Sequence, residues 1–284
     1  MNGIYWLASY PKSGNTWTRA FLDNYLNNGE APVNINTINN EIACNRNYFD
    51  EYIGLSSSDL DEGQIKLYQP YMYEEMVKKS SGDLYMKIHD AYILNRNNIP
   101  LIPKSVTKGV IYILRNPLDV AVSYAQHSAS TIDKAIHSLC DETFIASNSD
   151  SDFKKQLPQL FLSWSGHVKS WMESPLRVHL MRYEDMKANP HGSFREMLKF
   201  MGFEIDEDRL EKAVRFSSFD TLKQQEKEKG FKEKPTKAAS FFRKGQVGSY
   251  REELTQEQID TLVEYHRETM IKYGYLDENN QLVY

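Results

Sequence analysis

The 284-residue sequence lacks several features that define broad classes of protein. It has only two cysteines, Cys44 and Cys140, which give neither a disulfide framework nor a zinc-binding spacing and suit a reducing cytoplasm. It has no apolar stretch near the ~20 residues that a membrane-spanning helix needs, and no signal peptide precedes its first apolar run. These absences predict a cytoplasmic protein without a membrane span.

An excess of positive charge is also missing. The 34 lysines and arginines are outnumbered by 39 aspartates and glutamates, which gives a net charge of −5. General binding to nucleic acid therefore has no electrostatic support, and we expect no nucleic acid partner. Any polyanionic ligand must meet a local group of cations. The hydrophobic content of 40% is that of a globular protein, and the length of 284 residues suits one large or two small domains.

The first seventeen residues combine an apolar run, a polar loop and the start of a helix. Residues 4–8 predict a buried strand, residues 9–16 are small and polar around Lys12, and apolar residues recur at helical spacing from Thr16. Backbone N–H groups, the helix dipole and a lysine suit a bound phosphate. An ordinary strand-to-helix turn explains the stretch equally well, and the Walker A pattern is absent from the chain.

Two further predicted strands end at cationic residues. Residues 84–89 carry Lys87 and His89, which point to the same side because they are two apart on a strand. Residues 109–114 form a continuous apolar run that ends at Arg115. Open parallel sheets bind ligands at the carboxyl ends of their strands. Taken singly, residues 84–89 could equally be a half-exposed edge strand, and Arg115 could equally be a surface charge.

The rest of the chain alternates helical and strand patterns, which predicts an α/β fold with a parallel sheet. The main further elements expected are a helix over 159–172, a strand over 176–181, and helices over 194–201 and 255–273. Two segments, 128–152 and 223–240, are rich in small, polar or lysine residues and are predicted to be mobile.

Five sequence blocks occur in a familiar order: SYPKSGNTW, YMKIHD, YILRNPLDVAVSY, RYEDMKANP and FFRKGQVGSY. Together they resemble the signature of the cytosolic-type sulfotransferases, which use 3′-phosphoadenosine 5′-phosphosulfate (PAPS). The short sequences N-P-L-D and K-I-H-D suggest a bacterial member. The resemblance spans residues 9–250. It implies one sulfotransferase domain over residues 1–284, with a central parallel β-sheet flanked by helices and a P-loop-like fold related to nucleotide kinases.

The resemblance also implies a cofactor site assembled from distant parts of the chain. Its expected residues are Lys12, Ser13, Gly14, Asn15, Thr16, Trp17, Arg115, Ser123, Tyr183, Ser217, Phe219, Arg243, Lys244 and Gly245. The loop of Lys12 would hold the 5′-phosphosulfate, and Arg115 and Ser123 would bind the 3′-phosphate. Trp17 and Phe219 would lie near the adenine.

The catalytic residues that the resemblance implies are His89, Lys12 and Lys87. His89 would take the proton of a hydroxyl acceptor, a small-molecule alcohol or phenol, as the sulfuryl group moves in line. The two lysines would neutralise developing negative charge. The donor would be PAPS and the product 3′,5′-adenosine bisphosphate (PAP), with no metal.

The chain departs from the family pattern at three places. Asn15 stands where many animal relatives have threonine, although an amide can still donate to phosphate. Gly248-Ser249-Tyr250 replaces the common G-D-W, which leaves the packing there open. The K-x-x-x-T-V-x-x-x-E dimerisation motif of animal members is missing, so the oligomeric state is open.

Two other classes remain as alternatives. A nucleotide or small-molecule kinase would share the phosphate loop but would need a Walker A pattern and acidic Mg²⁺ ligands. A non-catalytic nucleotide-binding protein would have lost His89 or Lys12, and both are present. The acceptor is undetermined; aromatic residues that could form its pocket are Tyr68, Tyr71, Tyr73 and Phe144.

Overall fold

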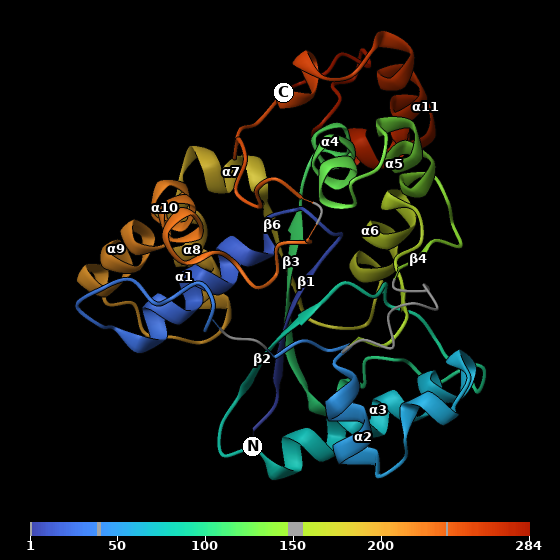
Figure 1. The fold of residues 1–284 in the computed structure, drawn as a ribbon, viewed down its shortest axis with the longest axis vertical. Helices are drawn as coiled ribbons and strands as arrows, with labels where there is room; N and C mark the ends of the chain where they lie inside the picture. The colour runs from blue at the N-terminus through green and yellow to red at the C-terminus, as the bar shows by residue number, and fades with distance from the viewer. Residues whose placement is uncertain (1, 39–40, 147–155, 237) are drawn as a thin grey trace. The chain divides into compact units, whose positions relative to one another are not determined.

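The computed structural model describes residues 2–38, 41–146, 156–236 and 238–284 (Figure 1). Its central feature is a four-stranded parallel sheet in the order β2-β1-β3-β6. The strands are β1 (Ile4–Ser9), β2 (Leu84–Ile88), β3 (Thr107–Leu114) and β6 (Val178–Arg182). All of β1 is buried, as expected of an apolar strand inside a parallel sheet. The predicted α/β class with a central parallel sheet is confirmed.

The chain divides into two compact units. The first comprises Met1–Tyr10, Asn40–Tyr112 and Glu142–His179, and the second comprises Pro11–Asn39, Ile113–Asp141 and Leu180–Tyr284. The chain thus passes from the first unit to the second directly after β1. One domain over residues 1–284 stays a prediction.

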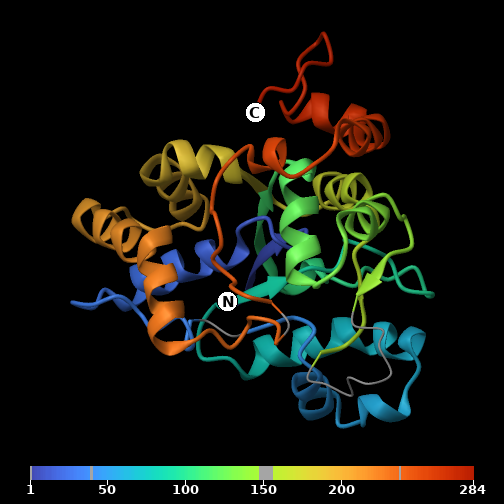
Figure 2. The same cartoon turned by 45° about the horizontal axis from the view of Figure 1, so that its top comes forward.

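The first unit contains three α-helices among its described residues. They are α2 (Arg46–Ile53), α3 (Glu62–Lys79) and α6 (Trp164–Met172), with short 3₁₀ helices η1 (Ser57–Asp59) and η2 (Lys104–Val106). Helices α2 and α3 pack together (Figure 2). The helix predicted over 159–172 begins only at Trp164, capped by Ser163, because β5 (Gln159–Leu160) pairs with β4 (Ile145–Ala146). The sequence-based start of this helix was therefore wrong.

The second unit is mostly helical. Its helices are α1 (Asn15–Asn27), α4 (Pro117–His127), α5 (Ile132–Leu139), α7 (Tyr183–Ala188), α8 (Pro190–Phe200), α9 (Glu207–Phe216), α10 (Phe219–Lys229), η3 (Ser249–Glu252) and α11 (Gln256–Lys272). Helices α1, α8 and α9 form one packed group, and α4, α5 and α11 form another (Figures 1 and 2). Thr255 and Gln258 make a capping box at the start of α11, the helix predicted over 255–273.

Both segments predicted to be mobile contain helical structure. Helix α5 occupies part of 128–152, and α10 extends through Lys229 into 223–240. Beyond α10, Glu233 pairs with the buried Arg19 of α1 at 2.8 Å. Residues 147–152 and 237 lie outside the described residues, and mobility of either segment stays a prediction.

No helix in the described part of the chain is long and apolar enough to cross a membrane. Cytoplasmic location stays a prediction.

Candidate active site

The loop after β1 has the geometry of a phosphate cradle. Lys12 and Gly14 both have positive φ angles, 70° and 113°. A Cβ on Gly14 would lie 2.9 Å from the ring of Tyr183, so only glycine fits there. Helix α1 begins at the next residue, so its first backbone N–H groups lie at this loop. The Ser13 hydroxyl is buried and has no hydrogen-bond partner among the described residues, which suits a residue that would bind a ligand.

Arg115 connects this loop with the C-terminal motif, which is the block FFRKGQVGSY at residues 241–250. Its guanidinium donates to the Lys12 carbonyl and to the Gln246 carbonyl, both at 3.1 Å. It also lies 4.4 Å from the ring centroid of Tyr183. The Lys12 ammonium lies 3.8 Å from the ring centroid of Phe241, in the C-terminal motif. The second unit therefore brings four of the five sequence blocks together.

The two cations of the C-terminal motif, Arg243 and Lys244, form ion pairs with glutamates. Arg243 pairs with Glu253 at 2.7 Å, and Lys244 pairs with Glu252 and Glu253 at 2.8 and 2.9 Å. Hydrogen bonds from both cations outweigh the effect of burial and lower the pKa of Glu253. An anion binding to these cations would therefore compete with two carboxylates. Neither glutamate was predicted from the sequence.

Gly245 is fixed by the aromatic ring that packs against it. It has a φ of 60°, and a Cβ at this position would overlap the Phe219 ring. The neighbouring backbone is held from α10, where the Glu226 carboxylate accepts from the N–H groups of Phe241 and Phe242 at 2.7 and 2.9 Å. The predicted residues Phe219 and Gly245 are therefore in direct contact.

Asp119 of α4 anchors Gly248-Ser249-Tyr250, where the chain departs from the family pattern. Its buried carboxylate accepts hydrogen bonds from Gly248 N, Ser249 Oγ and Tyr250 N at 2.9 to 3.1 Å. The serine thus provides a specific contact where the family pattern has another residue. Asp119 was not predicted from the sequence; the available signal was one carboxylate inside the apolar run 117–122.

The predicted adenine-side residues are also in the second unit. Trp17 packs edge-on against Tyr183 and Phe194, with ring centroids 5.9 and 5.6 Å apart. Its indole nitrogen is buried without a hydrogen-bond partner in the described ranges. The buried Ser217 hydroxyl donates to the Ala213 carbonyl at 2.8 Å. Of the predicted phosphate ligands, Ser123 is half-buried on α4, whereas Asn15 and Thr16 are buried in the first turn of α1.

The predicted base, His89, follows β2 in the first unit. Its Nδ1 lies 2.7 Å from the Ser9 carbonyl, which can only accept a hydrogen bond, and 3.3 Å from the Ser9 hydroxyl, which can also accept one. Nδ1 therefore carries the proton of the neutral ring, and the lone pair that can accept a proton is on Nε2. Lys87 is half-buried on β2. Both residues lie on or beside the strand that the sequence predicted.

Aromatic side chains surround Phe161 near His89. The Phe161 ring lies 6.2 Å from the His89 ring, 5.6 Å from Phe144 and 5.9 Å from Tyr10. Of the other candidate acceptor residues, Tyr68 and Tyr71 are exposed on α3, whereas Tyr73 is fully buried with its ring 4.9 Å from Trp6. Phe144 is the predicted pocket residue that belongs to the aromatic group around His89.

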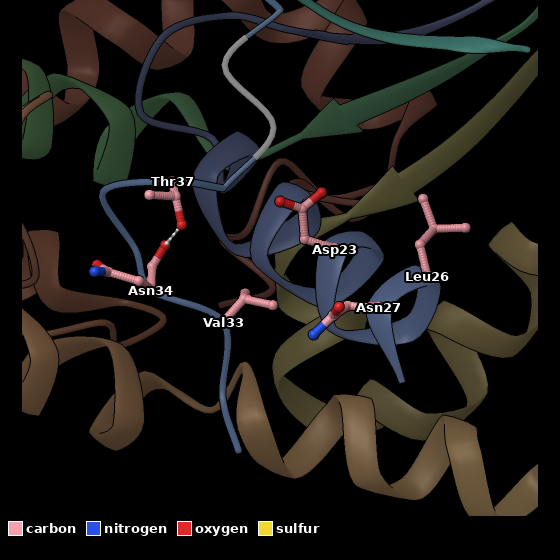
Figure 3. A pocket seen from close by; sticks show the side chains of 6 residues that line it. All are labelled: Asp23, Leu26, Asn27, Val33, Asn34 and Thr37. Carbon is pink, nitrogen blue, oxygen red and sulfur yellow. Dashed lines mark hydrogen bonds between the residues drawn. The ribbon is translucent and has the colours of Figure 1, made fainter. Parts of the chain in front are cut away.

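A separate pocket of about 480 Å³ lies beside the C-terminal half of α1 (Figure 3). It is lined by Asp23, Leu26, Asn27, Val33, Asn34 and Thr37. None of the predicted site residues lines it. Among the residues that the structure describes, no cluster of three or more histidine, cysteine, aspartate or glutamate side chains could hold a metal ion.

The sequence comparisons identify the family. The profile of the Sulfotransferase domain family matches residues 4–274, so the chain belongs to the sulfotransferases. It is 27% identical to Cytosolic sulfotransferase 17 of Arabidopsis thaliana, covering 92% of this chain and 73% of the relative. It is 26% identical to Sulfotransferase 1B1 of Mus musculus, covering 93% of this chain and 81% of the relative. The predicted family is confirmed.

Solved structures share the fold. Mouse sulfotransferase SULT7A1, complexed with PAP, aligns with a TM-score of 0.59 at 23% identity, covering 94% of this chain and 84% of that one. Retinol dehydratase, in complex with androsterone and PAP, aligns with a TM-score of 0.59 at 18% identity, covering 99% and 82%. These likenesses support the sulfotransferase fold predicted from the sequence.

Proposed function

We propose that this sulfotransferase uses PAPS as its donor and transfers the sulfuryl group to a hydroxyl of a small-molecule acceptor. The observation that carries the proposal is the pair of hydrogen bonds from Arg115 to the Lys12 and Gln246 carbonyls. They join to Arg115 the backbone of Lys12 and the backbone close to Arg243 and Lys244, so cation-bearing segments of three sequence blocks meet in a chain that is acidic overall. Such a local group of cations suits a ligand with several separated anionic groups.

The residues of the second unit fit such a nucleotide. The buried Ser13 hydroxyl and the N-terminus of α1 would receive the 5′-phosphate end, with Lys12 adding a positive charge. Arg115, Ser123, Arg243, Lys244 and the Gly245 backbone would hold the 3′-phosphate. The relatives whose structures contain PAP support this choice of nucleotide. The remaining predicted contacts would come from Gly14, Asn15, Thr16, Trp17, Tyr183, Ser217 and Phe219.

The chemistry requires a base and positive charge. PAPS, when bound, supplies an electrophilic sulfuryl group whose bridging S–O bond breaks as a new S–O bond forms to the acceptor oxygen. His89 Nε2 would accept the hydroxyl proton, since Nδ1–H is held by the Ser9 carbonyl. Lys12 and Lys87 would stabilise negative charge on the transferred group and on the leaving oxygen.

The aromatic group around His89 favours an acceptor with an apolar body, such as a phenol or an apolar alcohol. The Phe161 ring lies beside the His89 ring, and Phe144 packs against Phe161. Apolar walls with a few polar groups are usual in small-molecule sites.

The test is transfer of ³⁵S from labelled PAPS to phenols, aliphatic alcohols and sugars by the wild-type chain, by His89→Ala and by His137→Ala. His137 is exposed on α5 and serves as the matched control. We expect sulfated product from the wild type and the control, and a loss of about a hundredfold or more in His89→Ala. PAP binding without transfer would favour the non-catalytic alternative. Phosphate transfer from Mg²⁺-ATP would favour a kinase.

A further inference from the structure

One face of α6 holds the main chain directly after β2. His167 Nε2 lies 3.0 Å from the His89 carbonyl oxygen, and Trp171 Nε1 donates to the Asp90 carbonyl at 3.0 Å. His167 and Trp171 are four residues apart and therefore lie on the same face of the helix. Both side chains are fully buried. Two successive carbonyls, one of them that of His89, are thus fixed from a single helix.

The hydrogen bonds of His167 define one protonation state. The His89 carbonyl can only accept, so His167 Nε2 carries the proton and donates. Burial lowers the pKa of His167 to about 3, so the ring is neutral near pH 7. Its Nδ1 therefore accepts from the Tyr112 hydroxyl, 2.7 Å away on β3. Tyr112 thereby fixes the tautomer that donates to His89.

His89 is consequently held at two points. His167 fixes its main-chain carbonyl, and the Ser9 carbonyl accepts from its ring Nδ1–H. Together these contacts define both where the residue lies and how the imidazole is turned. A displacement of about 1 Å at a reacting group can cost about a hundredfold in rate.

We propose that His167 is a positioning residue for the base: its Nε2–H fixes the His89 carbonyl, which keeps His89 Nε2 in the orientation that accepts the acceptor's proton. Tyr112 supports this role by fixing the His167 tautomer. The proposal rests on the proposed function, because the orientation of His89 matters to the rate only if His89 is the base. A His167 that merely filled space in the core would stabilise the fold without setting the turnover rate.

Two amide substitutions separate these roles. In His167→Gln the side-chain N–H can reach the position of Nε2 and donate to the His89 carbonyl. In His167→Asn the shorter amide lies near the position of Nδ1 and can contact only Tyr112. Each variant loses one buried hydrogen bond, so similar decreases in Tm are expected. The two variants are therefore matched controls for each other.

The experiment measures kcat, KM for PAPS and Tm for both variants, the wild type and His89→Ala. We expect His167→Gln to keep kcat within about threefold, and His167→Asn to lose about ten- to a hundredfold in kcat with an unchanged KM for PAPS. Equal losses of kcat in the two variants, or an unimpaired His167→Asn, would overturn the proposal.

Tyr112→Phe provides the second test if the His167 variants do not fold. It removes the donor to Nδ1, and we expect kcat per folded molecule to fall about three- to tenfold with KM for PAPS unchanged. Unchanged kcat would refute the proposal. A wild type that transfers no sulfuryl group would refute the proposed function and this inference with it, and so would a fully active His89→Ala. If the wild type is active and His89→Ala is impaired, the comparison of the His167 variants decides the inference alone.

Discussion

The buried carboxylate of Asp119 accepts a hydrogen bond from the hydroxyl of Ser249 at 3.0 Å. The two residues are 130 positions apart, and their contact ties the C-terminal motif to α4. The same carboxylate accepts from the Gly248 and Tyr250 N–H groups. These contacts therefore fix the chain at residues 248–250, directly after the loop that carries Arg243 and Lys244.

Asp119→Asn is expected to destabilise the chain and weaken nucleotide binding. The amide NH₂ would face backbone donors, so at least one buried N–H group loses its partner, at a cost of about 3 kcal/mol. Urea unfolding measures the stability, and PAP titration measures the affinity. Ser249→Ala is the matched control, because it removes a single hydrogen bond and should cost about 1 kcal/mol. Equal effects of the two substitutions would contradict the central role of the carboxylate.

Glu253→Gln is expected to tighten PAP binding. The carboxylate neutralises Arg243 and Lys244 in the chain without nucleotide, and glutamine keeps an acceptor oxygen while removing that competing charge. We expect affinity to rise about three- to tenfold at low salt, with a steeper dependence on salt concentration. Calorimetry at two salt concentrations measures both. Glu264→Gln, on the exposed face of α11, should leave binding unchanged. Weaker binding in Glu253→Gln would mean that the carboxylate serves mainly to position the cations.

Asp90→Asn is expected to stabilise the chain in a pH-dependent way. Burial raises the pKa of Asp90 from its ordinary 3.8 to about 7, despite hydrogen bonding from Leu160 and the charge of Lys66. Between these two values the folded chain binds a proton that the unfolded chain has lost, so wild-type stability falls as pH rises towards 7. Asparagine does not titrate. Its advantage should therefore be largest at pH 8 and shrink by about 1.4 kcal/mol per unit from pH 7 to pH 5.

Urea unfolding of wild type and Asp90→Asn at pH 5, 6, 7 and 8 measures this difference. Comparing the two chains cancels the titration of other buried groups, such as His167 and His266, whose pKa values burial lowers to about 3. A difference in unfolding free energy that does not change with pH would contradict the raised pKa of Asp90.

The strongest sequence patterns were local ones. The run 4–8 became β1 and the following loop leads directly into α1, because burial and helix initiation there depend on neighbouring residues. The 18-residue helix α3 was missed because its aromatic residues follow no clear helical period and Pro70 lies inside it. Helix α6 was predicted too long because the pairing of β5 with β4 competes for residues 159–160.

The candidate site residues were predicted from motifs, whereas the residues that hold the site in place were not. Lys12, Arg115 and Gly245 belong to sequence blocks that the family resemblance identifies. Asp119 and His167 act through partners 130 and 78 residues away, which a single sequence does not pair. The roles of the site residues in binding and catalysis stay predictions.

The most direct test of the account is calorimetric comparison of PAP with 5′-AMP on the wild-type chain. A site with Arg115, Arg243 and Lys244 at the 3′-phosphate should bind PAP at least about a hundredfold more tightly, since a few charge-assisted hydrogen bonds supply about 3 kcal/mol or more. Equal affinity for the two nucleotides would contradict the proposed donor site.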